Sequence, residues 1–495
     1  MYFIGIDSGT QSTKSVVLDL ESGAIVAQAQ QAYDLIEGLP PGHLEQDPQL
    51  WIDAVDATIR QCLDSLGDGR SQVRGIGVSG QQHGLVALDE ADAVVRPAKL
   101  WCDTSTTDQC EQFAAEFGGA SGLIELAGNA MLPGYTAPKI LWMKQNEPEL
   151  FAAVRSVLLP HDYLNFWLTG IKRMEYGDAS GTGLLDVRSR EWCEALMNFI
   201  DPRMAELLPE LGSSNQPHGT LSAERSAAWG LGDSVVVSAG GGDNMMGAIG
   251  TGNIAPGVIT ASFGTSGTLY GCAGSAVVDP QGEIAAFCDS TDQWLPLVCT
   301  MNVTVVTEQV RKLFGWDLAQ LEAEAGGAEP GAGGITLLPY FNGERTPNLP
   351  NATGVIHGLT AANASAANLG RAAMEGATLG LAYGLRRFRE LGMDPSEIRI
   401  TGGGSKSDLW RQIAADVFGA PVVALATAEG AGLGAAIQAA HAAGEGDGYA
   451  DLCSRLVAVD ESSRCLPDSG RAAFYAEQLD RQMKLTTDLA AQDWL

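Results

Sequence analysis

Positive charge is scarce in this chain of 495 residues, in which 60 Asp and Glu stand against 30 Lys and Arg and give a formal net charge of −30. A field of that sign repels nucleic acids and anionic lipid surfaces, so we expect neither as a partner. A phosphorylated ligand would then need a site built locally from main-chain N–H groups, a few cations or a bound metal.

Closely spaced cysteine and histidine ligands are also lacking. The nine cysteines are an odd number and no two are separated by only two residues, which disfavours a disulfide framework and a zinc ribbon. None of the six histidines has metal-ligand spacing with a second one. We therefore expect no zinc site, and a reducing, cytoplasmic location.

Long uninterrupted apolar runs are absent as well. The charge-free stretch 244–278 contains eight glycines and Pro256, so it is too polar and too broken to span a bilayer. The apolar run 2–6 has no basic segment before it and an acid directly after it, so we expect a first β-strand there rather than a signal peptide.

The first residues predict a β-hairpin with a turn-rich tip. Residues 2–6 and 15–20 are apolar and flank the segment 7–13, which is rich in Gly, Ser and Thr. A third strand near 24–29 extends the hairpin. Further on, Asp47-Pro48 predicts the start of a helix that runs to residue 66. These signals indicate a layered α/β domain.

A second hairpin signal predicts a second domain. After the glycine-rich segment 239–244, residues 257–261 and 268–270 form two apolar strands around the small-residue tip 262–267. When the two tips are aligned, Gly264-Thr265 matches Gly9-Thr10. The two domains we expect are residues 1–245 and 246–495.

Later landmarks fit this second domain. A long helix is expected over 364–391 and a strand over 398–400. The capping-box pattern Ser405-Lys406-Ser407-Asp408 predicts that a helix opens at Ser405. The glycines 402–404 before it could accept an adenine or ribose face, although a tight strand-to-helix turn has the same sequence.

Two hairpin tips lined by N–H groups could hold a polyphosphate without net positive charge, whereas a single such tip is more often a simple turn. Asp7, at the end of the first strand, would anchor Mg²⁺ near the phosphates through water. Asp243 follows three glycines at the end of a buried strand, where open α/β sheets place ligand chemistry. A carboxylate there could accept a hydroxyl proton as a general base, and capping the following helix is the structural alternative.

Other polar residues suit a polyol. Gln82-His83 lies on a short loop between two strands and offers several donors and acceptors, although a lone histidine is more often structural. Trp101 could add an apolar wall, or belong to the core. Asp103 could add a further acceptor.

Seven segments, in register along nearly the whole chain, are shared with a known family: 5–10, 79–84, 135–142, 240–244, 262–267, 343–347, and 354–359 taken with 371–376. In them the chain resembles the FGGY carbohydrate kinases of the actin-like ATPase superfamily, most closely members that phosphorylate D-xylulose. The resemblance implies an α/β fold of two actin-like (ribonuclease H-like) domains flanking a central catalytic cleft. It also implies that the first domain binds the sugar and the second binds ATP.

The residues and the resemblance together define the candidate site. The expected catalytic residues are Asp243, as proton acceptor, and Asp7, as the metal-associated carboxylate. The expected substrate contacts are Gln82, His83, Trp101, Asp103 and Asn244. The expected ATP-binding residues are Gly9, Thr10, Gln11, Ser12, Thr13, Gly264, Thr265, Ser266, Gly403, Gly404 and Ser405. Some relatives carry Met at the position of Gln82, which bears on the preferred ketose.

The resemblance implies transfer of the γ-phosphoryl group of MgATP to the terminal hydroxyl of a ketopentose, with O5 of D-xylulose favoured. The expected partners are therefore a small-molecule sugar, ATP and Mg²⁺, and the sequence leaves a homodimer open. Kinases for ribulose, glycerol or a sugar alcohol are alternatives within the class. An actin-like ATPase that ignores sugar and a non-catalytic sugar sensor are alternatives outside it.

Overall fold

The computed structural model describes residues 1–427 and 429–495, which form two compact units. The first unit gathers Met1–Ile254, Cys272–Pro296 and Glu429–Val457. The second gathers Ala255–Gly271, 297–427 and Ala458–Leu495. The domain boundary expected after residue 245 lies close to Ile254, where the chain first leaves the first unit. The chain then returns to that unit at Cys272 and again at Glu429.

The first unit is built on a seven-stranded sheet in the order β13-β14-β5-β1-β2-β3, with β15 also paired to β5. The predicted hairpin is confirmed: β1 pairs antiparallel with β2, and β2 with β3. β5, β14 and β15 continue the sheet in parallel with β1. The strand bounds are β1 (Tyr2–Ser8), β2 (Ser12–Asp19), β3 (Ile25–Ala32), β5 (Val73–Gly80), β13 (Gly219–Thr220), β14 (Val236–Val237) and β15 (Gly241–Gly242).

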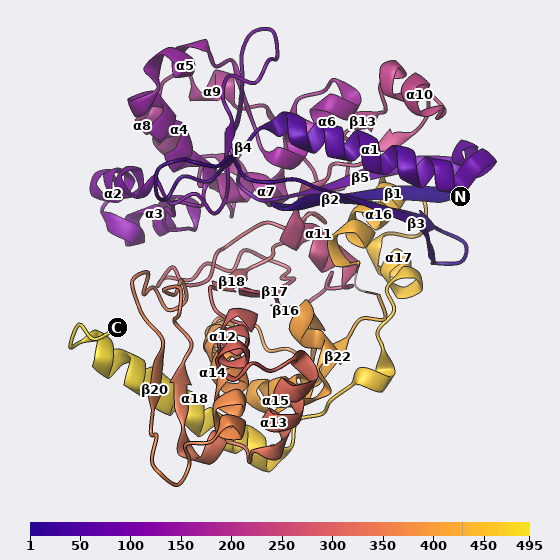
Figure 1. Ribbon diagram of the computed structural model, residues 1–495. Helices are drawn as coiled ribbons and strands as arrows, with labels where there is room; N and C mark the ends of the chain where they lie inside the picture. The colour runs from indigo at the N-terminus through magenta and orange to yellow at the C-terminus, as the bar shows by residue number, and fades with distance from the viewer. Residues whose placement is uncertain (428) are drawn as a thin grey trace. The chain divides into compact units, whose positions relative to one another are not determined.

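Helices cover both faces of this sheet because its strands alternate apolar side chains between the two faces (Figure 1). Ile4 and Ile6 of β1 pack in the core cluster that holds α1 (Pro48–Leu66) and α6 (Pro160–Thr169). Phe3 packs in the opposite cluster, with α11 (Asp243–Gly250) and α16 (Gly430–Ala442). As predicted, α1 begins after Asp47, whose carboxylate caps it, with Pro48 in the first turn.

The remaining elements of the first unit are short. Its other helices are α2 (Thr107–Glu116), α3 (Gly119–Ala127), α4 (Thr136–Asn146), α5 (Pro148–Ala153), α7 (Tyr176–Ala179), α8 (Glu194–Ile200), α9 (Met204–Leu207), α10 (Ala223–Trp229) and α17 (Tyr449–Leu456). Its two-stranded pairs are β4 (Glu45–Gln46) with β7 (Ala98–Lys99), β6 (Val86–Leu88) with β8 (Ser156–Leu158), β9 (Arg173–Glu175) with β12 (Glu210–Gly212), and β10 (Leu185–Asp186) with β11 (Glu191–Trp192).

The second unit repeats the topology in a five-stranded sheet of order β18-β17-β16-β21-β22. Three antiparallel strands are again followed by parallel ones, and the second predicted hairpin is β16 with β17. The duplicated topology is that of two actin-like domains, as the resemblance implies. The bounds are β16 (Val258–Phe263), β17 (Gly267–Gly271), β18 (Leu297–Thr300), β19 (Thr336–Leu338), β20 (Val355–His357), β21 (Glu397–Thr401), β22 (Val422–Ala424), α12 (Thr304–Phe314), α13 (Leu318–Gly327), α14 (Ala366–Glu390), α15 (Asp408–Phe418) and α18 (Ser469–Ala490).

One helix start differs from its prediction. The capping-box pattern placed the cap at Ser405, whereas α15 begins at Asp408 and is capped by Ser407, whose side chain accepts from Trp410 N. Residues 403–406 form a separate short 3₁₀ turn instead, because the glycines before Ser405 turn the chain first. Among the described residues, no helix is both long and apolar enough to cross a bilayer.

Candidate active site in the first unit

Three neighbouring strands of the first unit end at the same edge of the sheet. β1 and β15 both pair in parallel with β5, and the register sets Asp7 opposite Ser79 and Gly241 opposite the same serine. Asp7 therefore stands beside the loop that carries Gln82 and His83, and Asp243 follows directly after β15. The edge where parallel strands end is where α/β sheets place their ligand chemistry.

Asp243 is the first residue of α11 and is not its cap, because Gly242 takes that position without a side-chain bond. Its Oδ1 accepts from the main-chain N–H of Asn244 at 2.8 Å and from Asn244 Nδ2 at 3.0 Å. Burial, together with the negative charges of Asp7 and Asp178, raises the pKa of Asp243 to about 7. The carboxyl group can therefore take up and release a proton near neutral pH.

Gln82 and Asn244 are joined by a direct hydrogen bond. Asn244 Nδ2 donates to Gln82 Oε1 at 2.6 Å, and Gln82 Nε2 lies 3.0 Å from the sulfur of Met245. The structure thus brings together three predicted residues, Gln82, Asp243 and Asn244, from two segments far apart in the sequence. Their amides and carboxylate form a row of donors and acceptors suited to the hydroxyl groups of a sugar.

His83 lies next to this row and is almost fully buried, with 7% of its surface exposed. Its ring packs near Tyr135 and Phe287, at centroid distances of 5.5 and 5.3 Å. Its Nδ1 lies 2.9 Å from Oδ1 of Asp178, a residue that the sequence did not single out. Asp178 sits in a run of small residues, and no local pattern marks it as the partner of a histidine so distant in the chain.

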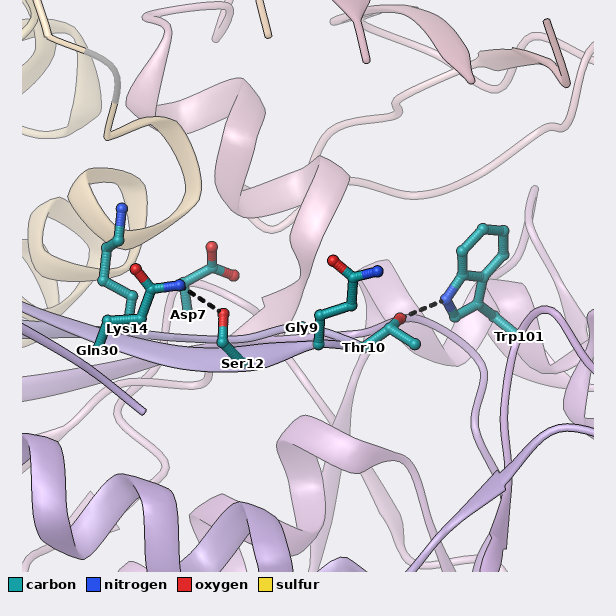
Figure 2. Close-up of a pocket in the computed structure, with 8 residues that line it drawn as sticks. Asp7, Gly9, Thr10, Ser12, Lys14, Gln30 and Trp101 are labelled. Atoms are coloured by element: carbon teal, nitrogen blue, oxygen red, sulfur yellow. Dashed lines mark hydrogen bonds between the residues drawn. The ribbon is translucent and has the colours of Figure 1, made fainter. Parts of the chain in front are cut away.

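The tip between β1 and β2 lines a polar pocket (Figure 2). Burial raises the pKa of Asp7 above its usual value, and the negative charge of Glu429 adds to the increase, although a hydrogen bond from Ser79 and the charge of Lys14 oppose it. Lys14 Nζ is paired with Glu429 at 2.9 Å. The pocket is lined by Asp7, Gly9, Thr10, Gln11, Ser12, Lys14, Gln30 and Trp101.

Hydrogen bonds hold this tip in place. Trp101 Nε1 donates to the hydroxyl of Thr10 at 3.0 Å, and Gln46 Nε2 donates to the Thr10 carbonyl at 2.7 Å (Figure 2 shows the first). Gly9 N donates to Ser12 O at 3.0 Å and closes the turn. Thr13, by contrast, is fully buried and its hydroxyl bonds to Ser8, so it does not line the pocket.

Asp103 is fully buried and its carboxylate already has protein donors. Oδ2 accepts from Leu44 N at 2.9 Å and from Lys99 Nζ at 3.1 Å, while Oδ1 accepts from Ser105. This geometry favours a structural role over the predicted sugar contact, because a sugar hydroxyl would have to displace one of these donors. The substrate role of Asp103 stays a prediction.

His43, Glu45 and Asp103 lie close enough together to suggest a metal site. The ammonium group of Lys99 stands among them, 3.2 Å from His43 Nδ1 and 3.1 Å from the nearest oxygen of each carboxylate. A lysine at the centre already supplies the positive charge that a metal would bring. We therefore interpret this cluster as a buried ion-pair network.

In the second unit, the predicted ATP residues lie at two adjacent strand ends. β16 and β21 are paired in parallel, so the tip 264–266 and the turn 403–405 follow neighbouring strands. Gly404 packs against Phe263, the last residue of β16. The carbonyl oxygen of Gly264 accepts from Thr304 N, and that of Thr265 accepts from Val303 N, at the start of α12. These bonds anchor the tip.

One further residue supports the segment that leads to Asp243. Gln438 of α16 is buried; its Oε1 accepts from Gly240 N at 2.8 Å, and its Nε2 donates to Gly240 O at 3.0 Å. The side-chain amide thus pairs with both main-chain groups of Gly240, as a neighbouring strand would. The sequence did not single out Gln438, because a glutamine within a small-residue helix carries no pattern of its own.

Comparison with known proteins identifies the family of this fold and site. The model of the FGGY family of carbohydrate kinases, N-terminal domain, matches residues 2–250, and the model of the C-terminal domain matches residues 261–443. The chain is 44% identical to a xylulose kinase of Haemophilus influenzae, over 97% of this chain and 98% of that protein.

Two solved structures from Lactobacillus acidophilus resemble the chain almost equally. A ligand-bound xylulose kinase has a TM-score of 0.91 at 26% identity and covers 99% of this chain and 98% of its own. A gluconate kinase has a TM-score of 0.92 at 27% identity with the same coverage. The fold is therefore shared by kinases with different sugar substrates, so it identifies the class of enzyme better than it identifies the sugar. This chain belongs to the FGGY family of carbohydrate kinases and is an enzyme that acts on a sugar and ATP.

Proposed function

We propose that the enzyme transfers the γ-phosphoryl group of ATP to O5 of D-xylulose and yields D-xylulose 5-phosphate and ADP. The observation that carries this proposal is the row formed by Gln82, Asn244 and Asp243, with His83 beside it. A carboxyl group with a pKa near 7 stands next to several polyol-binding groups, which is the arrangement that sugar phosphorylation needs. The xylulose kinases among the relatives support the choice of sugar.

Asp243 acts as the general base. Its carboxylate orients the terminal hydroxyl of the sugar and accepts its proton as the bond to phosphorus forms. Gln82, Asn244 and His83 hold the other hydroxyl groups, so that the reacting oxygen is aligned before transfer. Positioning of this kind supplies much of the rate increase in phosphoryl transfer.

Asp7 is the residue that would hold Mg²⁺ through water. The site fits such an ion, because its donors are the oxygens that Mg²⁺ prefers and because burial beside Glu429 leaves the carboxyl group with too little compensating charge. Mg²⁺ bound there would offset charge on the phosphate oxygens. Around that position, Asp7 accepts a hydrogen bond from the hydroxyl of Ser79, and Lys14 forms an ion pair with Glu429.

Each of the two units has its own set of residues that would contact ATP. In the first unit, the turn 9–12 offers main-chain N–H groups and hydroxyls to phosphate oxygens. In the second, the tip 264–266 offers similar groups and the turn 403–405 lies beside it, where the nucleoside part could bind. Trp101 contributes to this machinery by holding Thr10.

A panel of acceptors tests the proposal. D-xylulose, D-ribulose, glycerol, a sugar alcohol and D-gluconate are each supplied with MgATP, and ADP release is followed by a coupled assay. We expect D-xylulose to have the highest kcat/KM and NMR to place the phosphate on O5. A higher kcat/KM for another acceptor, or ADP release that does not depend on sugar, would reject it.

Gln82→Met is expected to raise KM for D-xylulose roughly fivefold, because Asn244 loses an acceptor worth about 1 kcal/mol. KM for ATP should not change, since the side chain of Gln82 is bonded to Asn244 and Met245. Steady-state kinetics with each substrate varied in turn measures both constants. An equal change in the two KM values would show that Gln82 acts through general packing instead.

A further inference from the structure

A buried carboxylate stands directly behind the imidazole of His83. Asp178, in α7, is fully buried, and its Oδ1 lies 2.9 Å from Nδ1 of His83. No pattern in the sequence marked Asp178, and the roles given above to the sugar-binding residues do not use it. The question is what this carboxylate does for a ring that is itself expected to touch the sugar.

A second imidazole sits on the other side of the same carboxylate. His161 Nδ1 lies 3.3 Å from Oδ2 of Asp178, and His161 Nε2 lies 2.9 Å from Oδ1 of Asp162. The side chains of His161 and Asp178 have no exposed surface, and that of Asp162 has almost none. Asp162 also accepts from Leu159 N at 3.1 Å, which fixes its own carboxylate. The four side chains form the row His83–Asp178–His161–Asp162.

The charges in this row are arranged to keep Asp178 ionised. Burial would lower the pKa of His161, but the carboxylates on both of its ring nitrogens outweigh burial and raise it well above the usual value. Burial would likewise raise the pKa of Asp178, but its contacts with the two imidazoles lower it to about 2. His161 is thus an imidazolium held between the carboxyl groups of Asp178 and Asp162, and Asp178 has an imidazole nitrogen 2.9 Å from one oxygen and 3.3 Å from the other.

The contact with Asp178 selects a protonation pattern for His83. An ionised carboxylate can only accept, so Nδ1 of His83 carries a proton and Nε2 becomes the nitrogen turned away from Asp178. A histidine held in this way presents the same nitrogen in the same plane each time a sugar binds. We propose that Asp178, supported by His161 and Asp162, is a positioning group that orients His83 for the sugar; this proposal rests on the proposed function.

The packing around the ring supports the same conclusion. A Cβ atom added at Gly181 would lie 1.8 Å from Cε1 and 2.0 Å from Nδ1 of His83, so only glycine leaves room for the ring against Asp178. The main chain of His83 adopts a positive φ of 61°, and Thr136 Oγ1 donates to its carbonyl at 3.0 Å. The backbone of His83 is therefore held by Thr136, and its ring by the segment 178–181.

Asp178→Asn tests the proposal at the carboxylate. Asparagine has the same shape but one acceptor and one donor group, so it cannot accept from both imidazoles. We expect KM for D-xylulose to rise about tenfold or more while KM for ATP stays within twofold. The matched control is Asp279→Asn, a fully buried carboxylate of the same unit that accepts hydrogen bonds from the main-chain N–H groups of Gln281 and Glu283. Equal changes in both KM values, or a sugar KM like that of the control, would overturn the proposal.

Gly181→Ala tests it without removing any polar group, and also serves if the asparagine variant fails to fold. The added methyl group must displace the His83 ring from Asp178, so the same selective increase in sugar KM is expected. Gly232→Ala is its control, because a Cβ atom there meets nothing within 4 Å. A Gly181→Ala enzyme with the sugar KM of the wild type would contradict the proposal.

A spectroscopic measurement separates this proposal from the proposed function. In protein labelled with ¹⁵N-histidine, long-range ¹H–¹⁵N spectra report which ring nitrogen carries a proton, and a His83→Asn sample assigns the signals among the six histidines. We expect His83 Nδ1 to be protonated in the wild type and to change in Asp178→Asn. A wild-type His83 with an unprotonated Nδ1 would overturn the positioning role, whatever the acceptor panel shows about the sugar.

Discussion

Replacing Asp243 by asparagine is expected to lower kcat for sugar phosphorylation by about 10²–10⁴-fold, the usual contribution of a general base. The amide can still accept from Asn244, so the start of α11 keeps its hydrogen bonds, but it cannot accept the proton of the sugar hydroxyl. KM for the sugar should change little, because the binding groups on Gln82 and His83 remain. The steady-state rate of ADP release at saturating substrates measures the loss of kcat.

The matched control for Asp243→Asn is Asp289→Asn. Asp289 is another carboxyl group of the first unit whose pKa is raised by burial, but its oxygens accept from Thr291 and Gln293 in a turn. This variant should keep most of its kcat. If Asp243→Asn also turned over at a rate within a few fold of the wild type, Asp243 would not be the base.

The raised pKa of Asp243 predicts opposite effects of pH on activity and on stability. The base works as the carboxylate, so kcat/KM should rise with pH and level off above about 7. The folded state binds the proton of Asp243 more tightly than the unfolded chain does. The contribution of this carboxyl group to the free energy of unfolding therefore falls as the pH rises from its unfolded pKa through about 7. Asp243→Asn, which never ionises, should gain melting temperature relative to wild type at pH 8 and gain less at pH 5. A constant difference would mean that the group does not titrate there.

Local patterns predicted the parts of this site that lie next to each other in the sequence. Both hairpins were predicted because apolar strands flank tips rich in Gly, Ser and Thr, and the structure has them as β1 with β2 and β16 with β17. Asp243 stood out because three glycines precede it at the end of a strand. In each case the signal is contained within about twenty residues, over which turn and strand preferences act directly.

The interactions that complete the site could not be predicted in the same way. The contact of His83 with Asp178 and the bonds of Gln438 to Gly240 join residues whose neighbours in the sequence carry no matching signal. Their pairing depends on how α7 and α16 pack in the first unit, which is a property of the whole fold. The same limit applies to the hydrogen bonds that the carboxylate of Asp103 accepts from Lys99 and Ser105, which no pattern in the sequence indicates.

Gly434→Ala is expected to reduce both stability and turnover, because α11 and α16 cross in backbone contact at this glycine. A Cβ atom on Gly434 would lie 1.8 Å from the carbonyl oxygen of Met246 and 2.8 Å from the nitrogen of Gly250, both in α11. Backbone atoms of a helix cannot move aside alone, so the whole of α11 must shift away from α16. Overpacking of this kind costs about 1–3 kcal/mol, and occasionally more.

The same shift reaches the chemistry, since α11 begins at Asp243 and a displacement of its axis moves the carboxylate relative to Gln82 and His83. A misplacement of about 1 Å can cost on the order of 10²-fold in rate, so the loss of kcat should exceed what partial unfolding explains. Thermal melts and kinetics below the melting range separate the two effects. Gly430→Ala, in the same helix but with nothing within 4 Å of the added methyl group, should keep the stability of the wild type. A Gly434→Ala enzyme that also kept both its melting temperature and its kcat would show that the crossing of α11 and α16 does not position Asp243.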